Sequence, residues 1–534
     1  MYRGESVYGT ICDIMKAFDS VWINGLLYKL HKYGIDIKSW KLIQNGYVNF
    51  KCAAFIDGKP SEWFVIMRGV HQGAPLSMLL YQLFINELLV LLKNSEFGLR
   101  LGPINVSCPA SADDIAILAL HKIGLNSMLQ IAFDYSIIWW FEWSMTKSKG
   151  IIWGKDQSPK TPIRFGNSDL EVVNRCKHLG IVKHNDKVPS KDIICERIGL
   201  GRSALLAARG IGSERIPTNP AVLNRIYWSI CIPRMLYGIE VVTLSDCDLN
   251  DLESAHKQNA KLIQNVPPSA PTPAVYSTLG WLSMDTYITQ VKILFLWKIA
   301  ICLRNTIYFQ VIRFIIEQII VGTYTSCKSP ILGILKRAKN LGIMQDIVEL
   351  VFSIDCDKSY TAEKAYIKDF IKDREQNRWK ATCLMFSSLS LFRKATSNIS
   401  LNCWWYYVKN KPAMFKRVSA LVAVLMGSQP TGLTHNFGGK ECGLCKVKCK
   451  EDAIHVMFEC SRLEVVRMRG WSRIEEVMPP AMKLSVEAMS NSEKTILILS
   501  GYGNRYIKEW EHLYENTAVF VYELYNLRNN LYAC

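Results

Sequence analysis

The sequence predicts an α+β fold in its first third and a mostly helical remainder. Up to about residue 185, strand-like apolar runs with hairpin-turn signals alternate with runs of helical spacing. Beyond residue 190 the apolar spacing is helical, interrupted by a Pro/Ser/Thr-rich connection at 266–273 and a Gly-rich Cys/His segment at 432–460. The 534 residues are enough for roughly three or four domains of ~100–200 residues each.

The first elements are predicted to be a strand and a helix separated by a carboxylate. Residues 6–12 are typical of a strand, which ends at Asp13. Residues 22–33 place Leu26, Leu27 and Leu30 at helical spacing, and Gly34 ends this helix.

Two hairpins and a long helix are predicted next. Apolar runs at 51–56 and 62–66 flank Asp57-Gly58, a strong hairpin-turn signal. Residues 77–92 are apolar nearly all round, which predicts a buried helix. The second hairpin is expected within 103–120, and the tandem acids Asp113 and Asp114 lie near its tip.

Composition narrows the class of partner and compartment. The formal charge of +17 favours a polyanionic partner, either nucleic acid or an anionic membrane surface, over an unspecialised basic surface only by even odds. Charged residues interrupt the apolar stretch 291–321, so no membrane span and no membrane partner are expected. The 17 cysteines are scattered and odd in number, which favours reduced thiols in an intracellular protein.

Strand-end carboxylates are the first candidates for chemistry. Asp13 ends one predicted strand, and Asp113 and Asp114 precede another. Carboxylates on neighbouring strands can hold two divalent ions ~4 Å apart, as needed for in-line attack of a hydroxyl on a nucleotide phosphate. Oxygen ligands of this kind suit Mg²⁺. A tandem pair of aspartates taken alone is more often a solvated turn.

Five segments in order give these carboxylates a context. They are Asp-Ile-Met-Lys-Ala-Phe-Asp at 13–19, Gly-Val-His-Gln-Gly-Ala-Pro-Leu-Ser at 69–77, Ser-Ala-Asp-Asp at 111–114, Ser-Met-Thr-Lys-Ser-Lys at 144–149 and Cys-Lys-His-Leu-Gly at 176–180. Together, across about residues 5–185, they resemble the palm of a LINE-type (non-LTR) retrotransposon reverse transcriptase. The resemblance implies an antiparallel sheet with helices, followed by a helical thumb.

The resemblance also implies roles for individual residues. Asp13 and Asp113 match the two carboxylates that bind Mg²⁺, and Asp114 is their neighbour. Lys147 matches a lysine that is a candidate general acid for the pyrophosphate, although Lys149 lies too near to be set aside.

Three further residues match substrate-binding positions of the family. Phe18 stands at the steric-gate position, where a flat ring under the sugar would favour dNTP over NTP. Gln72 and Gly73 match the loop that packs against the template–primer and the incoming nucleotide. Gly73 has no Cβ, so the backbone can approach the nucleotide closely.

The sequence also departs from the family pattern. Ser111 replaces an aromatic residue before Ala-Asp-Asp, and His71 stands where a basic residue is usual. The first motif comes almost at the start of the chain, without finger motifs or an endonuclease domain before it. We therefore expect a truncated or decaying copy, or an incomplete gene model, whose activity is in doubt.

A second metal site is predicted near the C-terminus. Cys442-x₂-Cys445-x₉-His455-x₄-Cys460 has the composition and spacing of zinc ligands, and Cys449 is a possible alternative ligand. A closed site would be structural and could contribute on the order of 10 kcal/mol to folding. The alternative is a loop of unmetallated cysteines. The family carries a Cys-Cys-His-Cys knuckle here.

The expected organisation is a palm with partial fingers (1–185), a helical thumb or connection (186–290), a helical region (291–431), a zinc knuckle (432–470) and C-terminal helices (471–534). The expected activity is RNA-directed DNA synthesis from a primer 3′-hydroxyl, using an RNA template, a DNA primer, dNTPs and two Mg²⁺ ions. The alternatives are a catalytically dead remnant that binds nucleic acid, and a scaffold protein with no such role. The family implies a nuclear location, and the oligomeric state is not indicated.

Overall fold

The computed structural model describes residues 6–154, 162–185, 190–210, 218–323, 329–353, 358–429, 441–445 and 449–533. It confirms the α+β prediction. Parts of the predicted zinc knuckle, residues 432–440 and 446–448, lie outside the described ranges. The chain forms two compact units: Met1–Pro189 with Leu303–Leu332 (unit 1), and Ser190–Cys302 with Gly333–Cys534 (unit 2).

An antiparallel four-stranded sheet forms the centre of unit 1. Its order is β10-β1-β9-β8, with β10 at Lys149–Trp153, β1 at Val7–Cys12, β9 at Asp114–Ala119 and β8 at Ala110–Ser111. The central strand β1 pairs with both β9 and β10. A Cβ at Gly9 would lie 2.7 Å from the ring of Trp153 and 2.8 Å from Leu118, so only glycine lets these side chains close over β1.

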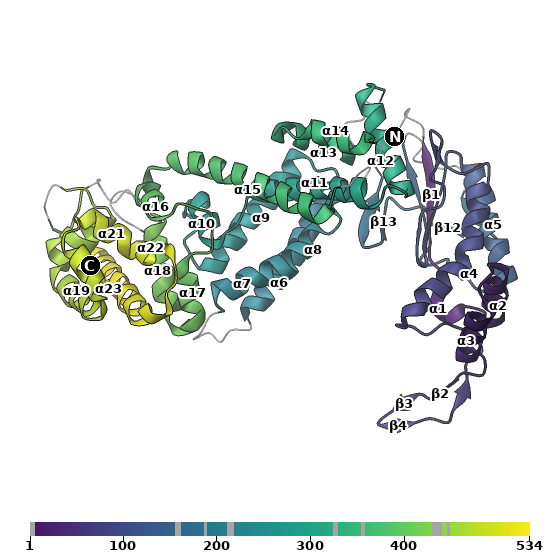
Figure 1. The fold of residues 1–534 in the computed structure, drawn as a ribbon, viewed down its shortest axis with the longest axis horizontal. Helices are drawn as coiled ribbons and strands as arrows, with labels where there is room; N and C mark the ends of the chain where they lie inside the picture. Colours follow the sequence, from purple (N-terminus) through teal and green to yellow (C-terminus); the bar gives the residue numbers. More distant parts are fainter. Residues whose placement is uncertain are drawn as a thin grey trace. The chain divides into compact units, whose positions relative to one another are not determined.

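Helices cover one side of this sheet (Figure 1). They are α2 (Ile23–Lys32), α4 (Pro75–Asn94) and α5 (Lys122–Trp139), joined by the short α1 (Ala17–Ser20) and by α3 (Ile37–Tyr47). Buried leucines and isoleucines of β9 pack against Leu125, Met128 and Leu129 of α5 in one apolar core. This core holds the strand ends in place.

Helix α4 forms where the sequence predicts it, but it is not buried all round. Leu80, Phe84 and Leu88 pack in the core, whereas Leu79 and Leu91 are about half exposed. The prediction of a fully buried helix is therefore wrong for one face. By length and composition alone α4 could cross a membrane, as could α11 and α12 if their bent pair were one span. The buried face of α4 is that of a core helix.

Short hairpins complete unit 1. The predicted hairpin around Asp57-Gly58 is present, and both turn residues have positive φ, as a tight hairpin turn requires. Figure 1 shows it extending away from the helices of its own unit. The strands are β2 (Lys51–Cys52) with β5 (Phe64–Val65), β3 (Phe55–Ile56) with β4 (Lys59–Pro60), β6 (Arg100–Leu101) with β7 (Ile104–Asn105), β11 (Ile163–Phe165) with β12 (Ser168–Leu170), and β13 (Arg175–His178) with β14 (Ile181–His184).

One helix of unit 1 comes from far along the chain. Helix α12 (Ile307–Ile320) lies within Leu303–Leu332 and contacts β7. Phe314 packs so closely on Gly102 in the β6–β7 turn that a Cβ there would meet its ring at 2.7 Å. The sequence predicts a helix here, but nothing in its periodicity indicates this partner.

Unit 2 is helical in its described part. Its α-helices are α6 (Ser190–Gly210), α7 (Pro220–Ile226), α8 (Ile232–Leu236), α9 (Asp246–Gln264), α10 (Thr272–Leu279), α11 (Met284–Cys302), α13 (Pro330–Leu341), α14 (Met344–Phe352), α15 (Tyr360–Leu384), α16 (Ser390–Ala395), α17 (Cys403–Asn410), α18 (Phe415–Leu425), α19 (Glu464–Val477), α20 (Pro480–Glu487), α21 (Asn491–Leu499), α22 (Gly501–Asn504) and α23 (Glu511–Ala533). One apolar cluster runs through these helices.

A buried histidine in this cluster gives unit 2 a pH dependence. His256 stacks on Trp281 at a ring distance of 4.5 Å, with Nδ1 2.8 Å from Tyr227 Oη and Nε2 3.2 Å from the carbonyl oxygen of Leu282. Complete burial lowers its pKa from 6.5 to about 3. In the unfolded chain the imidazole takes a proton as pH falls through 6.5, whereas in the folded chain it does not.

We expect stability to be full above pH 6.5 and to fall by about 1.4 kcal/mol per pH unit from this residue as pH decreases toward 3. Urea unfolding at pH 7.5 and pH 5 measures this. His256→Gln removes the titrating group and should flatten the difference, after allowance for its own cost. An equal pH dependence in both proteins would contradict the assignment.

Candidate active site and metal centre

Three carboxylates lie at one end of two neighbouring strands. Asp13 directly follows β1, whose last residue, Cys12, pairs with Ile115 of β9. Asp114 is the first residue of β9, and Asp113 precedes it in the two-residue turn that joins β8 to β9. The antiparallel register therefore brings Asp13 to the same end of the sheet as Asp113 and Asp114.

The turn that carries Asp113 has a strained backbone. Ala112 has a φ of 56°, a left-handed conformation that is uncommon for a residue with a Cβ. Such strain persists only where the surroundings enforce it, and it clusters at functional sites. Here the β8–β9 pairing on both sides of the turn fixes it and holds Asp113 at the sheet end.

Electrostatics link the three carboxylates to one buried tyrosine. Tyr81 of α4 is 1% exposed, and burial together with the charges of Asp113 and Asp13 raises its pKa. Burial also raises the pKa of Asp114, with Asp113 and Asp13 adding to the rise and His178 opposing it. The carboxylates are thus close enough to act on common neighbours, as a shared metal site requires.

The turn at residues 144–148 holds Asp13 from three directions. The backbone N–H of Asp13 donates to Ser148 Oγ (3.0 Å), and its carbonyl accepts from the backbone N–H of Ser144 (2.8 Å). Lys147 Nζ lies 3.5 Å from Asp13 Oδ2. Lys149 points elsewhere, with Nζ 2.5 Å from Glu171 Oε2. Of the two lysines the sequence left open, Lys147 is the one beside the carboxylates.

The predicted substrate-binding residues lie around this sheet end. Phe18, in α1, stacks on Tyr81 at a ring distance of 4.9 Å, so it shares a neighbour with Asp13 and Asp113. Gln72 Nε2 donates to Asp19 Oδ1 (3.0 Å). Gly73 has a φ of 86°, and a Cβ there would meet open space. Glycine is needed at this position for the backbone conformation, while the open space leaves access to the loop.

The sheet end fits a divalent cation. Asp13 Oδ2 and Tyr81 Oη are buried atoms that make no hydrogen bond to the described residues, and the Lys147 ammonium is the only cation within ion-pair distance of Asp13 there. A buried carboxylate oxygen without a donor is the ligand that Mg²⁺ prefers. Asp13 and Asp113 would hold such an ion.

The Cys/His cluster of unit 2 comes together as predicted. One ligand atom from each of Cys442, Cys445, His455 and Cys460 lies within 4.8 Å of the others. The Sγ atoms of Cys442 and Cys460 are 4.0 Å apart, and Cys445 Sγ is 3.5 Å from His455 Nε2. A tetrahedral zinc site with Zn–S bonds of 2.3 Å separates its sulfurs by about 3.8 Å. The cluster is compatible with zinc.

Neighbouring contacts orient this cluster and fix it to the last helix. His455 Nδ1 lies 3.6 Å from Glu459 Oε2, which leaves Nε2 for the metal side. Cys449 Sγ lies 3.4 Å from His455 Nδ1, so it remains an alternative ligand. Arg528 of α23 donates two bonds to the buried Glu451, at 2.9 and 3.0 Å. Loss of the metal would therefore disturb α23 as well.

Some residues of the site have no signal in the sequence. Tyr81 is one apolar position among many in α4, and Ser148 reads as an ordinary serine in a turn. His178 was noted only as part of a motif, although Asp114 raises and burial lowers its pKa, with burial the larger effect. All three act through contacts between residues far apart in the chain, which local patterns do not encode.

Comparison with known proteins decides the family of unit 1. Residues 2–182 match the family described as reverse transcriptase (RNA-dependent DNA polymerase). The chain carries a LINE-type reverse transcriptase domain. The five motifs, the antiparallel sheet and the three carboxylates all lie within the matched residues, and the predicted family and fold class are confirmed.

Relatives of this reverse transcriptase domain belong to mobile elements. The chain is 35% identical over 131 residues to the Pol polyprotein of retrotransposable element R2DM of Drosophila melanogaster, covering 24% of this chain and 12% of that protein. It is 31% identical over 235 residues to the RNA-directed DNA polymerase from mobile element jockey of Drosophila funebris (43% and 25%). The Drosophila melanogaster jockey polymerase is 24% identical over 286 residues (50% and 29%). The chain thus spans a minor part of each relative.

Proposed function

We propose that this chain synthesises DNA on an RNA template, extending a DNA primer from its 3′-hydroxyl with dNTPs. The observation that carries the proposal is the meeting of Asp13, Asp113 and Lys147 at one end of the sheet, with an oxygen of Asp13 that no described donor satisfies. The printed name of the jockey relatives, RNA-directed DNA polymerase, supports it.

Each residue of the site has a part in this chemistry. Asp13 and Asp113 would hold two Mg²⁺ ions, which when bound activate the attacking hydroxyl and stabilise the leaving oxygen. Asp114 sets the local field. Gln72 and Gly73 would pack against the template–primer and the nucleotide. Lys147 would give its proton to the pyrophosphate oxygen as the bond to the nucleotide breaks.

Replacing Lys147 with methionine should lower the rate of nucleotide incorporation by about 100-fold or more, because a positioned general acid typically contributes 10²–10⁴-fold. Single-turnover incorporation across a pH series measures it, and the alkaline limb of the wild-type profile should disappear. Lys149→Met is the matched control, since its ammonium pairs with Glu171. Equal losses in the two variants would contradict the role of Lys147.

Replacing Phe18 with valine should weaken discrimination against ribonucleotides by about 10- to 200-fold, the range for steric selection worth ~1–3 kcal/mol. The ratio of kcat/KM for dCTP and CTP measures this. Phe18→Tyr keeps the ring and should keep the discrimination. Unchanged selectivity in the valine variant would place the sugar away from Phe18.

The proposed activity places the chain in the nucleus, where chromosomal DNA could supply the primer. Cysteines free of disulfides in the described ranges support an intracellular site. Zinc bound by Cys442, Cys445, His455 and Cys460 would stabilise the fold of the C-terminal part. The charge of +17 suits a nucleic-acid partner.

Primer extension by the full chain tests the proposal. An RNA template annealed to a DNA primer, with dNTPs and Mg²⁺, should give extended DNA, and EDTA should abolish it. Salt-sensitive RNA binding without incorporation would instead identify a nucleic-acid-binding remnant. No binding at all would favour a scaffold.

A further inference from the structure

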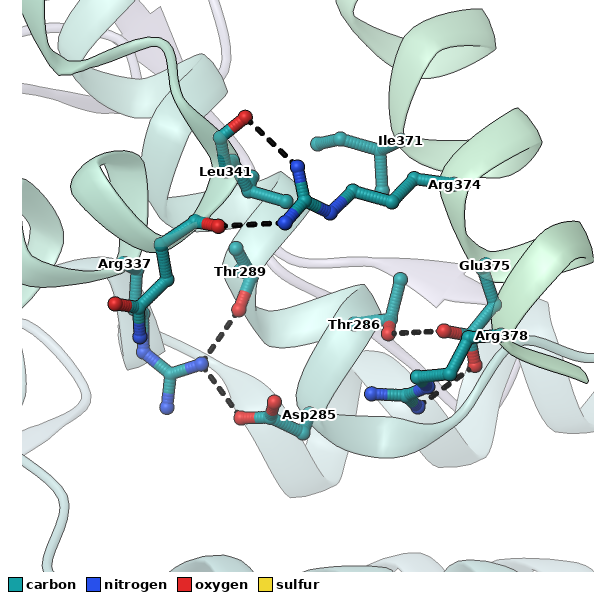
Figure 2. Close-up of a pocket in the computed structure, with 10 residues that line it drawn as sticks. Asp285, Thr286, Thr289, Arg337, Leu341, Ile371, Arg374, Glu375 and Arg378 are labelled. Atoms are coloured by element: carbon teal, nitrogen blue, oxygen red, sulfur yellow. Dashed lines mark hydrogen bonds and ion pairs between the residues drawn. The ribbon is translucent and has the colours of Figure 1, made fainter. Parts of the chain in front are cut away.

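A polar hollow in unit 2 gathers three arginines. It has a volume of about 460 Å³ and lies between α11, α13 and α15. Figure 2 shows the guanidinium groups of Arg337, Arg374 and Arg378 around it, with Asp285, Thr286 and Thr289 from the first turns of α11. None of these residues belongs to the polymerase site or to the Cys/His cluster.

The two carboxylates of the hollow are already paired. Arg337 Nη1 donates to Asp285 Oδ1 (2.6 Å) and to Thr289 Oγ1. Arg378 Nη2 donates to Glu375 Oε1 (2.9 Å). Each of these guanidinium groups uses one terminal nitrogen for these bonds, whereas a guanidinium carries five N–H donors on three nitrogens. Both arginines therefore keep donors for a ligand.

Arg374 leaves the hollow with an excess of positive charge. It donates to the carbonyl oxygens of Asn340 (2.7 Å) and Leu341 (3.0 Å) at the end of α13. Those carbonyls carry only partial negative charge, and no carboxylate in the described part of the chain lies within ion-pair distance of Arg374. Three guanidiniums thus face two carboxylates.

The surrounding surface extends this charge along α13. Lys336 and Lys339 are exposed beside Arg337, and α13 contains no acidic residue. A small isolated anion would need only the hollow, whereas a strand of phosphates matches both the hollow and this row of cations. Arginine forks suit phosphate oxygens because they bind them in pairs.

We propose that this hollow, the arginine pocket formed by Arg337, Arg374 and Arg378, binds a backbone phosphate of a single-stranded RNA, with Lys336 and Lys339 contacting the phosphates that follow. Contacts of this kind bind strands without reading their bases. The pocket would hold RNA on unit 2 whether or not the polymerase site is active, so it goes beyond the proposed synthesis.

The test measures binding of a labelled oligouridylate to the full chain by fluorescence anisotropy at several salt concentrations. Arg374→Gln with Arg378→Gln should lower the slope of log affinity against log salt by about 1.4, since each lost phosphate contact on a single strand removes about 0.7. Arg374→Lys with Arg378→Lys keeps the charge and should restore most of the slope. Lys368→Gln with Lys372→Gln is the matched control, because it removes two exposed cations from another face of α15.

A slope that is unchanged in the arginine variant, or lowered equally in the lysine control, would overturn the proposal. Calorimetric binding of inorganic phosphate alone, removed by the arginine substitutions without any change in RNA binding, would also overturn it and would identify a small-anion site. Circular dichroism and thermal unfolding confirm that the variants fold. Asp113→Asn should leave the slope unchanged, so failure here is distinguishable from failure of the polymerase proposal.

Discussion

Asp113→Asn is expected to lower nucleotide incorporation by about 1,000-fold or more, because losing a metal ligand removes several kcal/mol of transition-state stabilisation at ~1.4 kcal/mol per tenfold. Asp113 lies in the tight turn before β9, beside Asp13 at the end of β1, and the charges of both act on Tyr81. Single-turnover extension of a primer on an RNA template measures the loss.

Two companion variants make this result specific. Asp169→Asn removes an exposed carboxylate of the same unit, on β12, where it lies 3.6 Å from Arg164, and should leave incorporation unchanged. Asp114→Asn should have a smaller effect than Asp113→Asn, since Asp114 is proposed to shape the field and not to bind the metal. Incorporation that survives Asp113→Asn would mean that the carboxylates are wrongly assigned.

Cys460→Ser is expected to release zinc and to unfold the segment that follows residue 441. Structural zinc contributes on the order of 10 kcal/mol to the folding of such segments. Cys442 and Cys460 are both buried in the main apolar cluster of unit 2, and Glu451 binds Arg528 of α23. Loss of zinc should therefore speed hydrogen exchange in α23 as well as in the cluster.

Metal analysis of the purified chain gives the first readout, and hydrogen exchange the second. Cys449→Ser is the matched control, because Cys449 is a thiol of the same segment that lies outside the group of four. It should keep one zinc per chain. Zinc retained by Cys460→Ser, or lost from Cys449→Ser, would show that the ligand set is different.

Much of the active site could be predicted because its residues lie in short ordered motifs. Asp13 and Asp113 each adjoin a strand, and the order of the motifs brings those strands together. The choice between Lys147 and Lys149 could not be made, because two lysines separated by one residue look alike until the turn at 144–148 shows which one faces Asp13.

The remainder of the fold depends on contacts that local patterns do not record. Residues 303–332 read as one more helical stretch, yet Phe314 packs on Gly102 and places the stretch in unit 1. Helix α4 looks buried on every face, but its apolar residues outnumber the core positions available, so Leu79 and Leu91 are exposed. Hydrophobic periodicity predicts an element and not its partner.

Iron-directed cleavage measures most directly whether Asp13 and Asp113 share one metal site. Fe²⁺ that replaces Mg²⁺ generates hydroxyl radicals in the presence of ascorbate and peroxide, and these break the chain next to the bound ion. We predict breaks near both residue 13 and residue 113, suppressed by excess Mg²⁺ and by either Asp13→Asn or Asp113→Asn. Breaks near only one of the two residues, or breaks unaffected by the substitutions, would contradict a shared site.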